Sequence, residues 1–470
     1  MIRRMILSLL IVLMLAVSVG CSTQSAATSS DSSTPTSTTT SGTTPPTGTP
    51  PTGAAPGAGS SGTSTATNIS GAFALSSGTK STTAQSYTAT KADQSAIYVM
   101  GTGVLTLTNP TVTTSGSTSS QGNSSFYGQN AGMLAAGGGT IHMTGGTITT
   151  TGAGANGAFS TGTGSKVTLS QTTIDAKGDG GHAVMDTQGG SMTLSDVKMT
   201  TAGKNSGAIA TDRGGGTITA TGGTVVTSGQ DSPAVYSTGA ITVAGATLTA
   251  TGSEAAVIEG ANSITLNNCV TTSTFANKWG VMIFQSMSGD AEGARGVFTV
   301  TDGSLKYTAS PGPLFYVTNT TAIITLKDTD VSVASGILIN AAGGTRWGTS
   351  GSNGGIVEFT ADAQTLAGSV VADKISTVAL TLKNGSSLTG AINTAKTAKS
   401  ASLTLDASST WTVTADSHLT TLSDTASISG TIITNIIGGG HTVTYDKSAN
   451  PGLGGKTYTL SGGGVLKPAS

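Results

Sequence analysis

The feature that most constrains the fold of this chain is a group of three short β-type runs that recurs from about residue 94 onward. Representative first runs are Gly207-Ala-Ile-Ala-Thr, Pro233-Ala-Val-Tyr-Ser and Ala255-Ala-Val-Ile-Glu. A Gly-rich corner and two further runs follow each of them, and the period of about 22 to 28 residues is typical of solenoid repeats. Short alternating runs between turn residues, without helical periodicity, indicate strands that stack coil upon coil. We therefore expect an all-β parallel β-helix with three short strands per coil and about eleven coils.

The composition agrees with a folded β-solenoid rather than a disordered chain. Charged residues make up 9% of the 470 residues, and the mean hydropathy is +0.11. Disordered chains usually combine low hydrophobicity with high charge. Thr, Val and Ile suit pleated faces, and Gly suits corners that need a positive φ. A leucine-rich repeat of similar period would need a Leu-x-x-Leu-x-Leu frame, which is absent.

The N-terminus predicts export and a lipid anchor. Two arginines precede an apolar run from Met5 to Val19, which indicates a secretory signal peptide over residues 1–20. The run Ser18-Val19-Gly20-Cys21 resembles the lipobox of bacterial lipoproteins, with Ser18 where that family prefers an aliphatic residue. The resemblance implies a diacylglyceryl group on Cys21 and a surface-facing protein of the cell envelope, at the outer membrane in a Gram-negative source. The alternatives are an ordinary signal peptide with an incidental cysteine, or an uncleaved N-terminal anchor.

The rest of the chain divides by composition. Residues 21–67 are rich in Ser, Thr, Pro and Gly with Asp31 as the only charge, which predicts a disordered tether. We expect an N-terminal cap region over residues 68–93 and the parallel β-helix over residues 94–370. Residues 371–470 keep the strand rhythm less regularly, which predicts irregular C-terminal coils and a cap.

The repeat rhythm of residues 94–370 resembles the pectin-lyase-like superfamily of right-handed parallel β-helices, although no motif specific to one of its families is present. The C-terminal run Ser409-Thr410-Trp411-Thr412-Val413 resembles the final coils of autotransporter passengers and adhesin-like surface proteins. These resemblances imply a right-handed coil and say little about activity.

Charge and metal-ligand patterns exclude several function classes. The formal net charge is −1 and no block of basic residues occurs, so we expect no nucleic-acid partner. The two cysteines and four histidines have no metal-ligand spacing, so we expect neither a metal nor another cofactor. The second thiol, Cys269, lies in an apolar run and is expected to be buried.

Alternation along the first strand of each coil separates an interior column from an outward one. The predicted interior column comprises Ile97, Met133, Phe159, Val184, Ile209, Val235 and Val257. The predicted outward column comprises Tyr98, Leu134, Ser160, Met185, Ala210, Tyr236 and Ile258. In pectin-lyase-like enzymes the substrate lies across the outside of this strand stack, yet the outward column holds no Asp, Glu, Lys, Arg or His.

Two consequences follow for the first-strand face. Its nearest carboxylates are Asp186 and Glu259, three coils apart, which is too far for the paired carboxylates of a glycosidase. The outward residues Tyr98, Leu134, Met185, Tyr236 and Ile258 instead form an apolar stripe, which we interpret as a contact surface. The alternative is that a loop or residues 68–93 cover it.

The best ligand-binding candidate lies between two long loops. They span residues 285–295 and 343–353 and occupy equivalent corners two coils apart, which places them about 10 Å from each other. The notch between them would contain Asp290, Glu292, Arg295, Arg346 and Trp347. A Trp ring beside paired polar groups is a common way to hold a sugar. The alternative is a salt-bridged loop pair that stiffens the corner.

The sequence thus favours a lipid-anchored, non-catalytic surface β-helix for adhesion or glycan binding, with a polysaccharide or a host or neighbouring cell surface as partner. The alternative is a polysaccharide lyase or hydrolase of the pectin-lyase-like fold. Ice binding is a third class, since third strands carry pairs such as Thr147/Thr149. Asp175, Lys198 and Lys306 interrupt that ladder, so we expect no ice binding.

Overall fold

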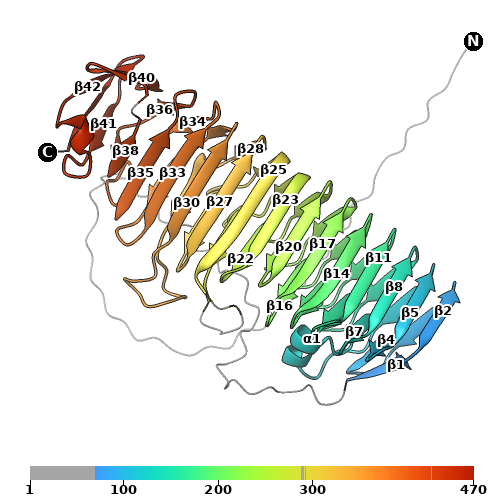
Figure 1. The fold of residues 1–470 in the computed structure, drawn as a ribbon. Helices are drawn as coiled ribbons and strands as arrows, with labels where there is room; N and C mark the ends of the chain where they lie inside the picture. The colour runs from blue at the N-terminus through green and yellow to red at the C-terminus, as the bar shows by residue number, and fades with distance from the viewer. Residues whose placement is uncertain (1–68, 287–290, 292, 425, 470) are drawn as a thin grey trace, which may run out of the picture. The chain divides into compact units, whose positions relative to one another are not determined.

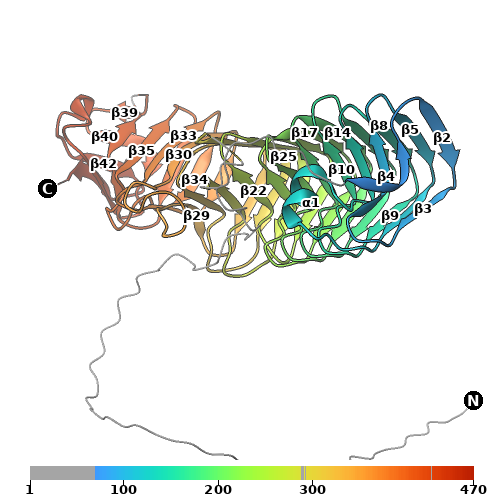
Figure 2. The same ribbon diagram turned by 90° about the horizontal axis from the view of Figure 1, so that it is seen from below.

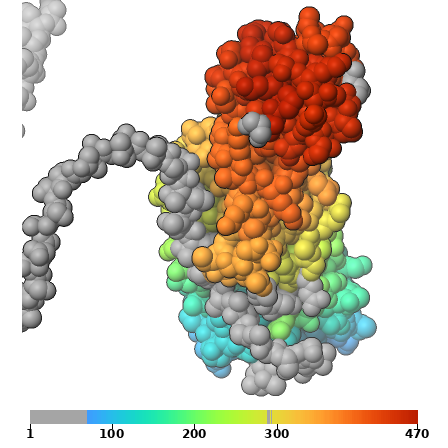
Figure 3. Space-filling view, turned by 90° about the vertical axis from the view of Figure 1, so that its left-hand side faces the viewer, coloured from blue at the N-terminus to red at the C-terminus, as the bar shows by residue number. Residues whose placement is uncertain are grey.

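The structure, a computed structural model, describes residues 69–286, 291, 293–424 and 426–469. Its described part is an all-β solenoid of about 16 parallel coils, 3% helical, so the predicted parallel β-helix is confirmed and the predicted coil count is too low. Successive coils follow the chain order from β1 to the C-terminal strands (Figure 1), and the space-filling view shows the same order of colours (Figure 3).

The first strands of the coils from β1 to β32 form one parallel sheet, which is twelve-stranded within the described residues. Its strands are β1 (Ser70–Leu75), β4 (Gln94–Met100), β7 (Met133–Ala136), β10 (Ala158–Thr161), β13 (Val184–Thr187), β16 (Ile209–Asp212), β19 (Val235–Ser237), β22 (Ala256–Glu259), β24 (Val281–Phe284), β26 (Phe315–Thr318), β29 (Ile337–Ala341) and β32 (Ser369–Ala372).

The second strands form the longest continuous stack of coils. They are β2 (Thr79–Thr83), β5 (Val104–Thr108), β8 (Thr140–Thr144), β11 (Lys166–Ser170), β14 (Gly190–Ser195), β17 (Gly216–Thr221), β20 (Ala240–Ala244), β23 (Ser263–Ser273), β25 (Arg295–Tyr307), β27 (Thr321–Lys327), β30 (Ile356–Asp362), β33 (Thr377–Lys383), β35 (Ser400–Leu405) and β38 (Thr421–Ser423). Strands β23 and β25 continue around the corner and supply the third strand of their own coils.

The remaining third strands are short. They are β3 (Ser86–Ala89), β6 (Thr111–Thr114), β9 (Thr147–Thr150), β12 (Thr173–Ala176), β15 (Lys198–Thr201), β18 (Thr224–Thr227), β21 (Thr247–Ala250) and β28 (Asp330–Val333). A separate C-terminal sheet contains β31 (Thr365–Ala367), β34 (Ser387–Gly390), β36 (Thr410–Val413), β37 (Ser417–Leu419), β39 (Ile428–Ser429), β40 (Ile432–Ile437), β41 (Thr442–Tyr445), β42 (Tyr458–Ser461) and β43 (Val465–Pro468). The 3₁₀ turn η1 (Pro451–Leu453) also lies in this region.

The corner between the second and third strands is tight and repeats in every regular coil. Its first residue has a left-handed backbone in Asn109, Gln171, Asp196, Gly222 and Gly245, among others. Gly222 is required for a second reason, because a Cβ there would lie 2.2 Å from Oδ1 of Asp196 in the coil below. Such corners leave no chain available to fold over the neighbouring sheet faces.

The coil count differs because both ends of the solenoid contain more coils than the repeat revealed. In the predicted cap region, β1, β2 and β3 form a complete coil whose strands pair with β4, β5 and β6. At the other end, β33 and β35 extend the second-strand stack beyond residue 370.

The interior is filled by aliphatic and aromatic side chains that form continuous columns. In the second strands the inward column runs through Leu105, Ile141 and Val167 and continues to Leu403, with every named member almost fully buried. In the first coil the same position is held by Lys80, which pairs in register with Leu105 and is exposed. Its Nζ lies 4.7 Å from the centroid of the Phe73 ring.

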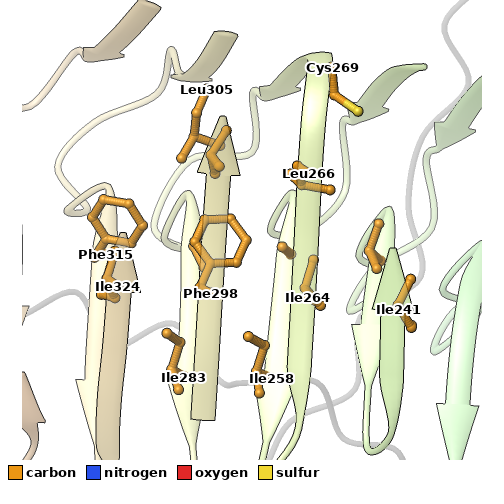
Figure 4. Close-up of a cluster of buried hydrophobic side chains, with 14 of the residues drawn as sticks. Ile241, Ile258, Ile264, Leu266, Cys269, Ile283, Phe298, Leu305, Phe315 and Ile324 are labelled. Atoms are coloured by element: carbon orange, nitrogen blue, oxygen red, sulfur yellow. The ribbon is translucent and has the colours of Figure 1, made fainter. Parts of the chain in front are cut away.

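The predicted first-strand columns are correct at most coils and wrong by one residue at two. Ala158, not Phe159, pairs with Met133 and Val184 in the interior column, so Phe159 points outward. Likewise Ala256 pairs with Val235, which turns Val257 outward. Ile258 consequently points into the interior, where Figure 4 shows it near Ile283. Cys269 is fully buried in the same cluster, as expected (Figure 4).

Candidate functional site

The structure describes three of the five residues predicted to line a notch between two loops. These are Arg295, Arg346 and Trp347, whereas Asp290 and Glu292 lie outside the described residues. The first loop follows β24, and the second follows β29. Both therefore leave the ends of first strands, as the sequence indicated.

Trp347 packs against the sheet of first strands. Its ring centroid lies 4.7 Å from that of Phe284, at an interplanar angle of 49°, and the residue is 9% exposed. The Cζ atom of Arg346 lies 4.9 Å from the Trp347 ring centroid. The ring therefore contacts protein groups and is not the open platform that sugar stacking requires.

Arg295 makes a different contact. Its Nη2 lies 3.5 Å from Oε2 of Glu358, and both side chains are largely exposed. The second loop is held by Asn353, whose Nδ2 donates to the carbonyls of Gly344 and Trp347. The structure thus brings Arg346 and Trp347 together and places Arg295 in a separate surface pair.

The residues of the predicted apolar stripe point to both sides of the first-strand sheet, and most of their surface is buried. Leu134 and Met185 point outward yet are 0% and 1% exposed, and Tyr98 and Tyr236 are half-buried. Ile258 points into the solenoid core, because Val257 occupies the outward position of that coil. An outward direction on this face therefore does not make a side chain accessible.

A short helix covers the N-terminal part of this face. Helix α1 (Gln121–Tyr127) stands outside the coils beside the first strands (Figure 2). The carbonyl of Phe126 accepts hydrogen bonds from Thr187 Oγ1 at 2.8 Å and Gln188 Nε2 at 3.0 Å. The helix ends at Gly128, where a Cβ would come within 2.7 Å of Leu134 and Phe159. The corner insertion thus buries this part of the apolar stripe, as the alternative interpretation required of a loop.

An aromatic cluster covers the same face farther along the solenoid. The rings of Trp279 and Tyr316 stack with centroids 4.3 Å apart and an interplanar angle of 10°. They pack with Val257, Met282 and Phe284, which are buried although they point away from the interior. Corner segments from successive coils therefore form a second, outer layer of apolar packing.

The two carboxylates nearest the first-strand face lie on opposite sides of it. Asp186 shares the inward side with Val184, and its Oδ2 accepts from the Thr217 backbone N–H at 2.8 Å. Burial raises the pKa of Asp186 to about 7. Glu259 lies on the outward side and accepts a hydrogen bond from Tyr236 Oη. These carboxylates therefore cannot act together on one sugar ring.

The second strands carry a regular array that the sequence analysis did not identify. Ten successive coils place a threonine at the same outward position in the strand register. The column comprises Thr168, Thr193, Thr219, Thr242, Thr265, Thr299, Thr325, Thr360, Thr381 and Thr404. Each of these side chains is exposed or half-buried. Within the described residues none of the ten hydroxyls makes a protein hydrogen bond, so each can donate and accept in contacts with a ligand.

The threonine column is one residue wide and its flanks vary. Thr106 and His142 extend it toward the N-terminus. The neighbouring outward positions include Lys166, Lys327 and Glu358. Aligning the second strands of the repeat, rather than only the Thr-x-Thr pairs of the third strands, would have revealed this column from the sequence.

Two properties of the described part of the chain concern membrane spanning and metal binding. No helix there is both long and apolar enough to cross a membrane. No three His, Cys, Asp or Glu side chains in this part of the chain group closely enough to hold a metal ion. The predicted lipidation site, Cys21, lies outside the described residues.

Comparison with known protein families, curated proteins and solved structures found no match to this chain.

Proposed function

We propose that this protein is a non-catalytic adhesive protein of the cell envelope that binds a polysaccharide surface through the threonine column. The single observation that supports this function is the run of ten outward threonines in successive coils. Coil stacking repeats the hydroxyls about every 4.8 Å. A linear polysaccharide also presents hydroxyls along its length, so several weak contacts can form along the column and add up to useful avidity.

The chemistry of threonine suits a neutral glycan. Its hydroxyl can donate to and accept from sugar hydroxyls, and its methyl group can pack against sugar C–H groups. The β-branched side chain is stiff at χ1, so the array loses little conformational entropy when a ligand binds.

A binding experiment with a matched control tests the role of the column. The double variant Thr219→Tyr/Thr242→Tyr blocks two neighbouring positions while keeping β-propensity. The control Thr200→Tyr/Thr249→Tyr places the same side chains on outward positions of third strands. We expect the first variant to lose at least about tenfold in affinity on glycan arrays and insoluble polysaccharides, and the control to bind like the wild type.

Two results would contradict this function. One is a wild-type chain that binds no glycan and adheres to no cell surface. The other is an equal loss of binding in the control. The same incubations measure released reducing ends and unsaturated uronides, whose appearance would favour the alternative of a polysaccharide lyase or hydrolase.

The envelope location rests on the lipobox resemblance and has its own test. Cys21→Ser removes the thiol that would carry the diacylglyceryl group. We expect the variant to leave the membrane fraction, whereas Cys269→Ser, the matched control at the buried thiol, stays in it. Unchanged membrane association of Cys21→Ser would refute the anchor.

A further inference from the structure

Three charged side chains form a buried cluster at one corner of the solenoid. Asp231, Glu254 and Lys278 come from three successive coils, each from the corner between a third strand and the next first strand. Lys278 Nζ lies 2.8 Å from Asp231 Oδ1 and 3.4 Å from Glu254 Oε1. The side-chain exposures are 4% for Lys278, 2% for Asp231 and 0% for Glu254.

Burying these three groups as ions costs free energy. Such a cluster is also unusual in a chain with so few charges. Two carboxylates against one ammonium leave an uncompensated buried negative charge, and burial of unpaired charge is strongly unfavourable. Glu254 Oε2 accepts from Ser253 Oγ, whereas Oε1 makes no hydrogen bond to the described residues. One carboxylate oxygen therefore faces the ammonium group without a hydrogen-bond donor of its own.

The surrounding chain fixes Lys278 and excludes solvent. Tyr307 Oη donates to the Lys278 carbonyl at 2.9 Å. Gly312 packs so closely on this carbonyl that a Cβ would lie 1.7 Å from its oxygen. The Trp279 ring centroid is 5.9 Å from Lys278 Nζ. These contacts fix the backbone of Lys278, and the amine and the Asp231 carboxyl, 2.8 Å apart and almost fully buried, are shielded from bulk water.

We propose that Lys278 and Asp231 are joined by an intramolecular isopeptide bond, with Glu254 as the proton carrier. Glu254 takes a proton from Lys278 Nζ, and the freed lone pair attacks Cγ of Asp231. A Cγ–O bond then breaks, and the departing oxygen leaves as water after receiving the two protons that the nitrogen has lost. The ammonium and the carboxylate become one neutral amide and one water, so the step needs no oxidant or co-reactant.

Two physical effects favour this reaction here. Fixed contact between nucleophile and carboxyl makes the step effectively unimolecular, for which effective molarities reach about 10⁵–10⁸ M in well-oriented systems. The product also removes the ammonium group and the Asp231 carboxylate from a low-dielectric site, and hydrolysis would have to recreate both ions there. The charge that stays on Glu254 keeps its hydrogen bond from Ser253 Oγ. The bond would tie a coil to the second coil after it, across 47 residues of sequence.

The spacing of trypsin sites makes the bond directly measurable in the full-length chain. No Lys or Arg occurs between Arg213 and Lys278, and the next site is Arg295. A free Lys278 gives two peptides, 214–278 and 279–295, after denaturation and digestion. An amide on Lys278 blocks cleavage there, so we expect a single peptide 214–295 that is lighter than its sequence by one water.

The surface pair of Lys306 and Asp330 is the matched control, because its N–O distance is 2.7 Å but both side chains are solvent-exposed. We expect complete cleavage at Lys306 with no mass loss. Glu254→Gln should fold, as judged by its circular dichroism, and cleave normally at Lys278. Asp231→Ala should also restore cleavage. Normal cleavage at Lys278 in the wild type overturns the proposal, and a bond that still forms in Glu254→Gln overturns the role given to Glu254.

Discussion

Two outer faces of the same solenoid differ sharply in what they offer to solvent. On the first-strand face the outward residues Leu134, Phe159 and Met185 are at most 1% exposed, beneath α1 and corner segments. On the second-strand face the outward threonines remain accessible. The difference arises at the corners, because the insertions follow third or first strands whereas the corner after each second strand is tight. Accessibility in a β-solenoid is therefore decided by corner length as much as by strand alternation.

The largest effect we expect is the difference in stability loss between a substitution in the interior and one on the open face. Val235→Asp places an unpaired carboxylate in the fully buried column and should lower the free energy of unfolding by at least about 4 kcal/mol. Thr242→Asp, on the threonine column, should stay within about 0.5 kcal/mol. Chemical denaturation of both variants measures the difference, and similar losses would show that the register is wrong.

The next test asks whether the covered face behaves as a core. Phe159→Ala removes an outward ring that is 0% exposed, and we expect a loss of about 3–5 kcal/mol, as in a conventional core. Thr168→Ala, on the open face one strand later, is the control and should change stability little. A loss of less than 1 kcal/mol in Phe159→Ala would mean that the outer layer contributes nothing to stability.

A pH experiment compares two titratable groups near β13, namely Asp186, which points inward from the strand, and His182, which lies in the corner before it. Asp186 has its pKa raised to about 7 by burial, so the folded chain binds more protons there than the unfolded chain between about pH 4 and 7. Stability from Asp186 therefore falls as pH rises through this range. Desolvation lowers the pKa of His182 to about 4, although its ring nitrogen Nδ1 contacts the Gly207 carbonyl at 2.8 Å. Stability from His182 therefore rises with pH between about 4 and 6.5.

The pH dependences of stability from Asp186 and His182 have opposite signs and partly cancel in the wild type. Removing one group in a single variant therefore reveals the contribution of the other. We expect Asp186→Asn to become more stable from pH 4 to 6.5, and His182→Gln to become less stable from pH 4 to 7. Each change should be on the order of 3 kcal/mol, because one pKa unit corresponds to about 1.4 kcal/mol. Urea titrations at a series of pH values measure it. Parallel curves for both variants and the wild type would contradict the assignment of these groups.

The last prediction is that the open face has no ice-binding activity. A lattice-matching face needs a two-dimensional array, whereas the threonine column is one residue wide and is flanked by Lys166, Lys327 and Glu358. We therefore expect no thermal hysteresis and no reshaping of ice crystals by the purified protein. Measurable hysteresis that Thr219→Tyr/Thr242→Tyr abolishes would reassign the open face to ice binding.

The repeat in the sequence was enough to predict the class of fold, because period, turn residues and β-branched runs all point to stacked coils. The errors have local causes. Phe159 was placed inside because it is the largest residue of its run, but α1, which covers it, is a short segment without an amphipathic pattern. The packing of the Trp347 ring on Phe284 was not predictable, because the sequence does not specify which face of the solenoid a long loop folds against.

The buried charges were missed for a related reason. Asp231, Glu254 and Lys278 are separated by more than twenty residues each and carry no motif. Only the coil register brings their corners together. The threonine column could have been found, because it follows from the same repeat once the second strands are aligned.

The side chain that begins the second-strand interior column has a consequence for assembly. Lys80 occupies the register of Leu105 and Ile141 but belongs to the first coil, with its ammonium group above the Phe73 ring. A further coil from another molecule that stacked on this end would have to bury that charge without a partner. Inward-pointing charge on an edge strand is a known protection against edge-to-edge pairing. We therefore expect Lys80 to oppose end-to-end pairing of the described solenoid with another copy.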